Sequence, residues 1–487
     1  MVRPAVSSAR AARTLFTMAA LLAGAACARN GESPVAPLPG DTVPALTDAQ
    51  FLDDVARRTF DFFWETANPA NGLVPDRWPT ESFSSIAAVG FGLTAYPVGV
   101  ERGWITRTQG AERTLATLRF FWTAPHSDAA AGVTGHRGFY YHFLDMQTGE
   151  RFQTTELSTI DTGLLMMGVL TAQQFFDGAG PVEAEIRALA DSLYRRVEWD
   201  WAVVRPPRIV MAWHPERGFG DYDYEGYDEA MFLYVLALGS PTHPVEPEAW
   251  TGFTSSYDWL IFQGQEHVNF APLFGHQYSH VWIDFRGIRD AYMRGRGIDY
   301  FENSRRATVA QRTYAIANPN GWTGYGASLW GLTASDGPGA FSATISGRAR
   351  EFHGYWARGA AAGDVRDDGT IAPTAAGGSI PFAPEIAIPA LREMHLRWGQ
   401  YLYGEYGFRD AFNLTLGAVT STPRGRVVPG IGWFNDDYLG IDQGPILLMI
   451  ENHRSEMIWE LIRESPYIVR GLCRAGFTGG WLAGRCA

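Results

Sequence analysis

The sequence predicts an all-α protein, an (α/α)6 barrel of inner and outer helices with long loops on one rim. One pattern is a series of amphipathic segments, with apolar residues at helical spacing on one side and charges on the other. A second pattern is a series of segments that are apolar on nearly every side and are opened by polar residues. Because a helix that is apolar all round is buried, the alternation predicts six helical hairpins that place one ring inside another.

Four segments carry the amphipathic pattern and are expected to be outer helices. The first has Phe51, Val55, Phe60, Phe63 and Trp64 at helical spacing. The last stops at an Asn-Pro pair, which is a normal helix ending. The four segments are residues 48–67, 108–124, 181–199 and 300–319.

Segments of the second kind are expected to be inner helices whose polar first residues and preceding loops share one rim. They are residues 84–100, 158–176, 226–239, 274–285, 326–335 and 440–452, with 383–394 as a possible seventh. Loops on a rigid scaffold usually carry function, so this rim is the expected functional face.

The N-terminal sequence is typical of a secretion signal. Arg3, Arg10 and Arg13 precede a short apolar stretch that ends at Cys27. We expect residues 1–27 to be a bacterial lipoprotein signal with Cys27 lipidated. The mature protein is then expected in the periplasm or at the cell surface, lipid-anchored in the outer membrane of a Gram-negative bacterium.

The remaining chain divides into three parts. Residues 28–46 form a Pro-rich polar tether, residues 47–477 the helical catalytic domain, and residues 478–487 a C-terminal tail. Only Cys473 and Cys486 remain after the signal. Because a secreted protein meets an oxidising compartment, a disulfide that ties down the tail is expected.

Composition narrows the classes of partner and cofactor. The net charge of −12 argues against a nucleic acid or an anionic membrane surface, which need clustered Lys and Arg. No zinc-protease, serine-hydrolase or phosphate-loop motif is present in the sequence. His276 and His280 are four residues apart, but nothing suggests a third ligand. We therefore expect no metal and no cofactor.

Carboxylates are densest in "DYDYEGYDE", residues 221–229. Its start imitates a calcium loop, but Phe232 stands where the bidentate acid belongs. Carboxylates with many aromatics fit glycoside hydrolysis, in which one protonated acid serves the leaving oxygen and a second carboxylate activates water or attacks directly. Glu225 is crowded by Asp221, Asp223 and Asp228, which would keep it protonated, so it is the expected general acid.

Two further acids open the segment "TTELSTIDTGLL". Glu156 lies in a loop one turn before the expected helix, and Asp161 lies at its start. For Asp161, helix capping is at least as good an interpretation as catalysis. The expected substrate contacts are Tyr227, Trp213, His276, Gln277, Tyr141, Trp330 and Asp442.

Several long stretches resemble the bacterial glucoamylase-like (glycoamylase-like) domain, whose characterised members include the endo-β-1,2-glucanases of glycoside hydrolase family 144. They include "GFYYHFLDMQTGERFQTTELSTIDTGLL", "GYDEAMFLYVLALGSPTHP" and "YLGIDQGPILLMIENHRS", and they are collinear over residues 47–477. The resemblance implies an (α/α)6 barrel and an anomer-inverting hydrolase with acidic residues in its cleft. It implies roles for Glu156 and Glu225, with Asp145 as a further cleft acid.

The base stays open between Asp145, Glu156 and Asp161. Asp228 stands where the family pattern leads us to expect Asn. The sequence thus predicts a monomeric endo-β-1,2-glucanase that acts on β-glucan by inversion and touches the membrane only through its lipid. The alternatives are a polysaccharide lyase, which would abstract a proton with Tyr or His, and a surface glycan-binding lipoprotein without catalysis.

Overall fold

The computed structural model describes residues 46–486. The expected signal peptide, the lipidated Cys27 and nearly all of the expected tether lie outside the described residues. Among the helices of the described part, none has the length and apolar character that crossing a bilayer requires.

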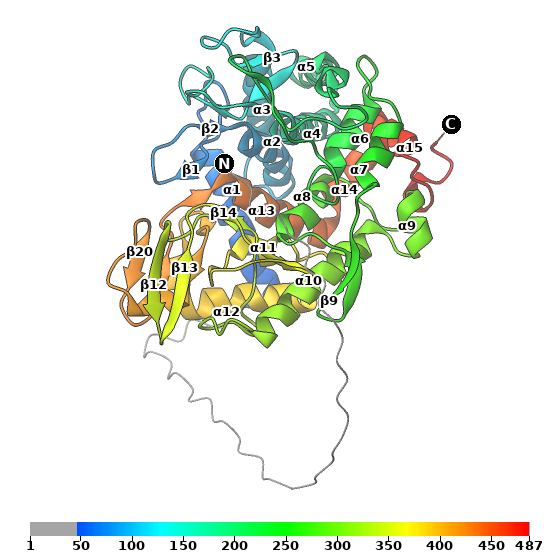
Figure 1. The fold of residues 1–487 in the computed structure, drawn as a ribbon. Helices are drawn as coiled ribbons and strands as arrows, with labels where there is room; N and C mark the ends of the chain where they lie inside the picture. The colour runs from blue at the N-terminus through cyan, green and yellow to red at the C-terminus, as the bar shows by residue number, and fades with distance from the viewer. Residues whose placement is uncertain (1–45, 487) are drawn as a thin grey trace. The chain divides into compact units, whose positions relative to one another are not determined.

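Helices dominate the described chain (Figure 1). The α-helices are α1 (Asp48–Glu65), α2 (Ile86–Glu101), α3 (Arg107–Thr123), α4 (Thr159–Phe175), α5 (Pro181–Arg196), α6 (Met231–Gly239), α7 (Glu248–Thr254), α8 (Tyr278–Trp282), α9 (Ala291–Arg296), α10 (Tyr300–Ala317), α11 (Pro373–Gly377), α12 (Pro384–Leu402), α13 (Gly440–Ser455), α14 (Met457–Arg463) and α15 (Pro466–Arg474). Short 3₁₀ turns are η1 (Trp199–Ala202), η2 (Leu273–His276), η3 (Leu414–Ala418) and η4 (Gly480–Leu482).

Six buried helices contact one another in succession. Helix α2 packs on α4 and α13, α4 also on α6, and α13 on α11. The remaining links are hydrogen bonds: the backbone N–H of Phe232 in α6 donates to Ser279 Oγ in α8 at 3.1 Å. Gln277 Nε2, just before α8, donates to the carbonyl of Ala375 in α11 at 2.8 Å. The contacts therefore run from α2 through α4, α6, α8, α11 and α13 back to α2.

Glycines let the first two of these helices approach closely. A Cβ on Gly90 of α2 would lie 2.3 Å from the carbonyl oxygen of Leu164 in α4. A Cβ on Gly168 of α4 would lie 2.2 Å from the carbonyl oxygen of Gly90. Both helices are buried along nearly their whole length, as expected from their apolar composition.

The amphipathic helices flank this set with one face each. Helix α1 packs on α13 and α2, α5 on α4 and α3, and α12 on α11. In α1 the buried positions include Phe51, Val55, Phe60 and Phe63, which confirms the spacing seen in the sequence. Helix α10 ends where Asn318 takes the left-handed conformation with φ of 42°.

The strands are short and correct the expectation of an all-α protein. They form one five-stranded sheet, β3-β4-β6-β7-β8, one three-stranded sheet, β19-β21-β20, and two-stranded ribbons. The bounds are β1 (Arg77–Trp78), β2 (Ser84–Ser85), β3 (Gly135–His136), β4 (Phe139–Tyr141), β5 (Phe143–Leu144), β6 (Leu157–Ser158), β7 (Ala212–His214), β8 (Gly218–Phe219), β9 (Trp259–Phe262), β10 (Gln265–Val268), β11 (Ala334–Ser335), β12 (Phe341–Ile345), β13 (Arg348–Phe352), β14 (Trp356–Ala357), β15 (Gly359–Ala361), β16 (Asp364–Arg366), β17 (Tyr403–Gly404), β18 (Gly407–Phe408), β19 (Phe412–Asn413), β20 (Arg426–Val428), β21 (Gly432–Phe434) and β22 (Tyr438–Leu439).

Several strands lead directly into buried helices. Strand β2 ends at Ser85, β6 at Ser158 and β22 at Leu439, each immediately before α2, α4 or α13. Ser85 and Ser158 accept hydrogen bonds from backbone amides of the first helical turn and so cap α2 and α4. The strands and their loops therefore fix the residues that precede these helices.

Two of the expected inner helices are wrong. Residues 326–335 form no helix, and residues 383–394 belong to the flanking helix α12. The buried helix at this point is α11, built from Pro, Thr, Ala and Gly. Its small side chains give no strong hydrophobic signal, although all its residues are buried.

The C-terminal segment is tied down as the sequence suggests. Cys473 and Cys486 form a disulfide, 13 residues apart in the chain. Thr478 exchanges backbone hydrogen bonds with Arg289, and Trp481 Nε1 donates to the carbonyl of Asp284. The tail thus packs against the loop that follows α8.

Candidate active site

A histidine lies between two carboxylates at the start of α4. His142 Nδ1 is 2.8 Å from Glu156 Oε1, and His142 Nε2 is 3.6 Å from Asp161 Oδ2. Burial opposes the charged form of His142, but the charge of Asp161 and the hydrogen bond with Glu156 raise its pKa to about 9. Burial would raise the pKa of Glu156, yet its bond to the charged His142 holds that pKa at about 2. At neutral pH, the protonated His142 therefore lies between the carboxylates of Glu156 and Asp161.

Ser158, and not Asp161, caps helix α4. The Asp161 backbone N–H donates to Ser158 Oγ at 3.2 Å. The Ser158 hydroxyl in turn donates to Asp161 Oδ2. The capping interpretation of Asp161 is therefore wrong, and its carboxylate is held at the helix start by Ser158 and His142.

Glu229 lies immediately before the buried helix α6. Its neighbour Asp228 accepts a hydrogen bond from the Ala230 backbone N–H at 2.8 Å. The Asp228 side chain therefore stabilises the turn that precedes α6. Burial and the negative charge of Asp161 raise the pKa of Glu229 to about 7. Within residues 46–486, its carboxyl group is hydrogen-bonded only to its own backbone amide. Glu229 is thus a carboxylic acid that still holds its proton in about half of the molecules at pH 7.

A second group of acids surrounds Arg77. Arg77 Nη1 lies 2.6 Å from Asp336 Oδ2. Asp410 Oδ2 accepts from Asn435 Nδ2 at 2.8 Å and from the backbone N–H of Asp336 at 2.9 Å. Burial and the charge of Asp336 raise the pKa of Asp410 to about 7.

Asp442, in the first turn of α13, hydrogen-bonds to Asp410. Burial and the charge of Asp410 raise its pKa well above the usual range. Asp442 Oδ2 is buried and has no hydrogen-bond partner in the described part of the chain. Two buried carboxyl groups in contact hold a proton between them, because both cannot ionise at little cost.

Two tyrosines link the groups. Burial raises the pKa of Tyr278, at the start of α8, and the charges of Asp442, Glu229 and Asp161 add to the effect. Enclosure by neighbouring protein atoms, followed by the charges of Asp442 and Asp410, raises the pKa of Tyr355, although Tyr355 is 55% exposed to solvent. Carboxylates of both groups therefore lie near enough to the Tyr278 hydroxyl to raise its pKa.

Two cavities lie near these residues, one lined by Asp228, the neighbour of Glu229, and one lined by Arg77 and Asp336. One cavity of about 400 Å³ is lined by Glu225, Asp228 and Asn269, among others. The other, of about 490 Å³, is lined by Arg77, Asp336, Asn435 and others. Both volumes lie in the range of about 300–1,000 Å³ that small-molecule sites have. No group of three or more His, Cys, Asp or Glu residues within 46–486 is arranged to hold a metal ion.

The model of the glycoamylase family, described as "Putative glucoamylase", matches residues 221–466, about half of the chain. The chain belongs to the glycoamylase family. The matched region includes Glu229 and the three acids around Arg77.

Relatives extend the likeness to nearly the whole chain. An exo β-1,2-glucooligosaccharide sophorohydrolase (non-reducing end) from Parabacteroides distasonis is 30% identical over 465 residues, or 88% of this chain. The chain spans 58% of that relative's length. The structure of a putative glucoamylase from Bacteroides uniformis is 33% identical with a TM-score of 0.76, covering 90% of this chain and 99% of that one. The endo-β-1,2-glucanase of Chitinophaga pinensis, in complex with sophorotriose and glucose, is 28% identical with a TM-score of 0.76, covering 90% and 100%.

Within this glycoamylase-family chain, Glu225 does not have the surroundings that its sequence neighbours suggest. Its Oε2 pairs with Arg208 at 2.9 Å, and its side chain is 47% exposed. Asp223 pairs with Arg205 at 2.5 Å. The expected crowding of like charges is thus relieved by arginines of the preceding loop, and Glu229, which is partly buried, is the acid whose pKa is raised instead.

Asp145 is also separate from the two carboxylate groups. Its Oδ1 accepts hydrogen bonds from the backbone N–H groups of Gln147 and Thr148 at 2.9 and 2.8 Å. These bonds lower its pKa, with the bond from Thr148 contributing most. Asp145 organises a turn, as Asp does in many loops.

Three of the expected substrate contacts are fully buried. Trp330 and Tyr141 are fully buried, and Tyr141 lies under the guanidinium of Arg151 at 4.7 Å. His276 is fully buried, and its Nε2 lies 3.2 Å from the carbonyl of Phe270. Aromatic and histidine side chains near a rim are more often core than ligand, and the sequence alone does not separate the two.

The other expected contacts have mixed positions. Gln277 is buried and joins α8 to α11 through Ala375 and Ser379. Tyr227 lines the cavity beside Glu225. Trp213 is partly exposed and stacks on His136 with ring centroids 4.9 Å apart. Asp442 belongs to the acid group around Arg77.

Sequence reasoning missed Glu229, Asp336, Asp410 and His142 as site residues. Glu229 was visible in the acid-rich stretch, directly before the apolar run of α6. Asp336 and Asp410 are isolated acids in loops more than 70 residues apart, and the fold joins them through the backbone bond from Asp336 to Asp410 and through Asn435 Nδ2, which donates to both. No local pattern marks such residues.

Proposed function

We propose that the protein is an endo-β-1,2-glucanase that hydrolyses β-glucan with inversion of the anomeric centre, with Glu229 as general acid. The observation that carries the proposal is the pKa of Glu229, raised to about 7 by burial and by Asp161. A general acid must hold its proton at the working pH, and an acid with a pKa near that pH transfers it most effectively.

The relatives supply the substrate class. Two of them act on β-1,2-linked glucans, one as an exo sophorohydrolase and one as an endo-glucanase. We further propose that the six buried helices and their flanking partners form the (α/α)6 barrel expected from the sequence. The succession of contacts from α2 round to α13 and back to α2 supports this architecture.

Asp442 is the proposed base. Inversion requires a second carboxyl group across the cleft that takes a proton from the attacking water. Asp442 Oδ2 has no partner among the described residues, and the pair with Asp410 accommodates a proton. In this proposal the proton that the pair shares lies on Asp410 and leaves Asp442 ionised, and its raised pKa makes the Asp442 carboxylate a stronger base than an exposed Asp. Asp161, held by His142 and Ser158, then serves to keep Glu229 protonated.

The endo mode rests on the two cavities. One is lined by Asp228, the neighbour of Glu229, and the other by Arg77 and Asp336 of the group that includes Asp442. A polymer that crosses the cleft would place sugar units in both, whereas an exo enzyme needs a closed pocket at one end. Linear β-1,2-glucan should therefore give a range of short oligosaccharides early in the reaction, and exclusive release of disaccharide would contradict the endo mode.

The deciding experiment substitutes Glu229→Gln, which keeps the shape and removes the proton donor. Hydrolysis of linear β-1,2-glucan should fall by about 10²–10⁴-fold, the usual contribution of a general acid. Glu225→Gln should lose less than about ten-fold, and the matched control Asp145→Asn should retain wild-type turnover. Products are read by chromatography and their anomeric form by NMR.

Three outcomes would overturn the assignment. A fully active Glu229→Gln variant would exclude this residue as the acid. A product with an unsaturated ring, detected by ultraviolet absorbance, would identify a lyase. Glucan binding without any product would identify a non-catalytic binding protein.

A further inference from the structure

A third cavity lies on the opposite face of the β1–β22 ribbon from the cavity lined by Arg77, which is called the cleft cavity below. Strands β1 and β22 pair antiparallel with Trp78 opposite Tyr438. Successive residues of a strand point to opposite faces, and Arg77 and Asp437 line the cleft cavity. Trp78 instead lines a separate cavity of about 390 Å³.

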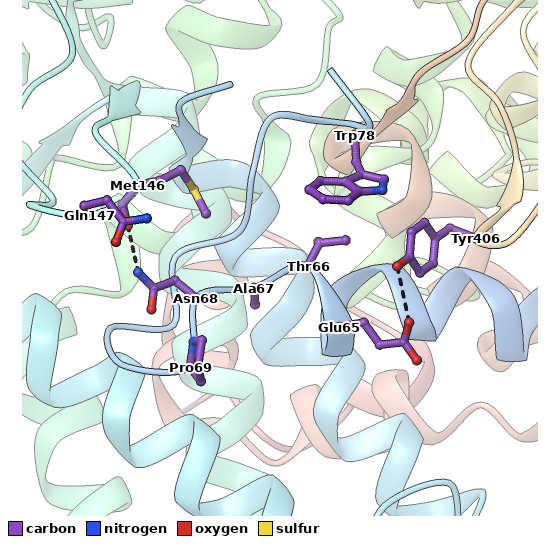
Figure 2. Close-up of a pocket in the computed structure, with 9 residues that line it drawn as sticks. All are labelled: Glu65, Thr66, Ala67, Asn68, Pro69, Trp78, Met146, Gln147 and Tyr406. Carbon is purple, nitrogen blue, oxygen red and sulfur yellow. Dashed lines mark hydrogen bonds between the residues drawn. The ribbon is translucent and has the colours of Figure 1, made fainter. Parts of the chain in front are cut away.

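One wall of this cavity is aromatic. Figure 2 shows Trp78 and Tyr406 on one side, facing Met146, Gln147 and Asn68 on the other. The Trp78 side chain is 41% exposed although its strand is paired and fixed. Because burying an indole ring is strongly favourable, an exposed indole on a paired strand beside a cavity indicates a binding platform.

The other groups of the cavity are polar and partly unpaired. Glu65 is the last residue of α1, where the helix dipole disfavours a negative charge, and its Oε2 accepts from the Tyr406 hydroxyl at 3.2 Å. Asn68 Nδ2 is fixed by the carbonyl of Met146 at 2.9 Å. In the part of the chain that the structure describes, the exposed carboxamide of Gln147 has no hydrogen-bond partner.

These groups match a neutral sugar ring. The C–H faces of a β-glucosyl unit stack on an aromatic ring, and its hydroxyls pair with a carboxylate and a carboxamide. An anionic ligand would be repelled by Glu65, and an aliphatic ligand would leave Glu65 and Gln147 unpaired. We propose that the cavity at Trp78 is a second glucan-binding site, which holds glucosyl units of the polymer outside the cleft.

Its position relative to the cleft favours the substrate polymer itself as the occupant, so the inference rests on the proposed β-glucanase function. Thr80 lines the cleft cavity, and Trp78, two residues earlier in the chain, lines the cavity shown in Figure 2. A glucan that leaves the cleft beside Thr80 reaches the Trp78 platform across the edge of the ribbon. The site would raise affinity for long chains and leave short ones unaffected.

The test compares Trp78→Ala and Gln147→Ala with Trp122→Ala. Trp122 is also 41% exposed, but it lies on α3 under Arg196 and lines none of the three cavities described above. Binding to linear β-1,2-glucan is measured by affinity electrophoresis in the Glu229→Gln background, which retains the cleft. Each pocket variant should bind the polymer about three- to ten-fold more weakly, the usual effect of losing one aromatic contact or hydrogen bond.

Kinetics provide the second readout. In the active enzyme, Trp78→Ala should raise KM for the polymer by a similar factor and leave kcat unchanged. Its kcat/KM for a short oligosaccharide that fills only the cleft should equal that of the wild type. Circular dichroism and thermal unfolding confirm that each variant is folded.

Failure of this inference differs from failure of the proposed function. Hydrolysis and polymer binding that are unchanged in Trp78→Ala would overturn the second site and leave the glucanase intact. Binding that depends on Trp78, in a protein that hydrolyses no glucan, would overturn the glucanase and leave the site. No binding of any glucan by the Glu229→Gln protein would overturn the second site.

Discussion

At the scale of single residues, His142 decides the charge at one side of the cleft. Its pKa of about 9 keeps it cationic at neutral pH, where it neutralises Glu156 and lies beside Asp161. A folded-state pKa above the ordinary value means that the stability it contributes is fully present below about pH 6.5. That stability is lost as pH rises through about 9.

Replacing Glu156 by Gln tests whether the raised pKa of His142 contributes to the stability of the fold. The pKa of His142 should fall toward its ordinary value, because the hydrogen-bonded carboxylate is gone. The free energy of unfolding at pH 7 should drop on the order of 1–3 kcal/mol, and the difference from wild type should shrink above pH 9. NMR titration of the imidazole and thermal unfolding against pH check both.

A matched control is Asp200→Asn, which removes the acid 3.5 Å from the exposed His243 and should change stability little at any pH. A loss in Glu156→Gln that is as large at pH 10 as at pH 7 would contradict the linkage. It would indicate a purely steric role for Glu156.

Asp161 gives a second prediction at this scale, on the pH profile. Deprotonation of Glu229 should lower kcat/KM as pH rises through about 7. In Asp161→Asn the like charge is absent, so the pKa of Glu229 falls and the alkaline limb moves to lower pH. The control Asp145→Asn should leave the alkaline limb of the kcat/KM profile unchanged. An unchanged limb in Asp161→Asn would show that Asp161 does not raise the pKa of Glu229.

At the scale of elements, the contact between α2 and α4 depends on glycine. A Cβ at Gly168 would lie 2.2 Å from the backbone oxygen of Gly90, and backbone cannot move aside as a side chain can. Gly168→Ala should therefore destabilise the protein by about 2 kcal/mol or more, although alanine is the better helix former. Thermal unfolding measures the effect.

Gly295 supplies the control for this substitution. It also lies in a helix, α9, but an added Cβ there would meet nothing within 4 Å. Gly295→Ala should be neutral or slightly stabilising. Equal effects at the two positions would mean that helix propensity, and not packing, governs both.

At the scale of the whole molecule, the disulfide ties the end of the chain to the loop after α8. The bond joins residues 13 apart and constrains the unfolded chain, which stabilises the fold by about 3 kcal/mol for a loop of this size. The double substitution Cys473→Ser and Cys486→Ser should lower the unfolding temperature. Its glucanase activity at 25 °C should stay unchanged, because neither cysteine borders the carboxylate groups or the cavities beside them.

Added reductant provides the internal check. It should lower the unfolding temperature of the wild type to that of the double variant and leave the variant unchanged. A wild type that is insensitive to reductant would mean that tail packing alone, through Thr478 and Trp481, holds the C-terminus.

The sequence by itself was enough for the helical class, for most helix positions and for the family. Periodicity is a local property, so α1, α3, α5 and α10 follow from spacing, and α2, α4, α6 and α13 follow from apolar runs. Helix α11 was not predictable, because its burial comes from its neighbours and not from its own small residues. The strands were missed because most of them have only two or three residues, which are too few to show alternation.

Only the tertiary structure decided which acids share the candidate site. Glu225 and Glu229 are four residues apart, yet one pairs with Arg208 at the surface and the other lies beside Asp161. Asp336, Asp410 and Asp442 come from three distant segments, and Arg77 joins them from a fourth. A pKa depends on burial and on charges brought close in space, and neither quantity can be read along the chain.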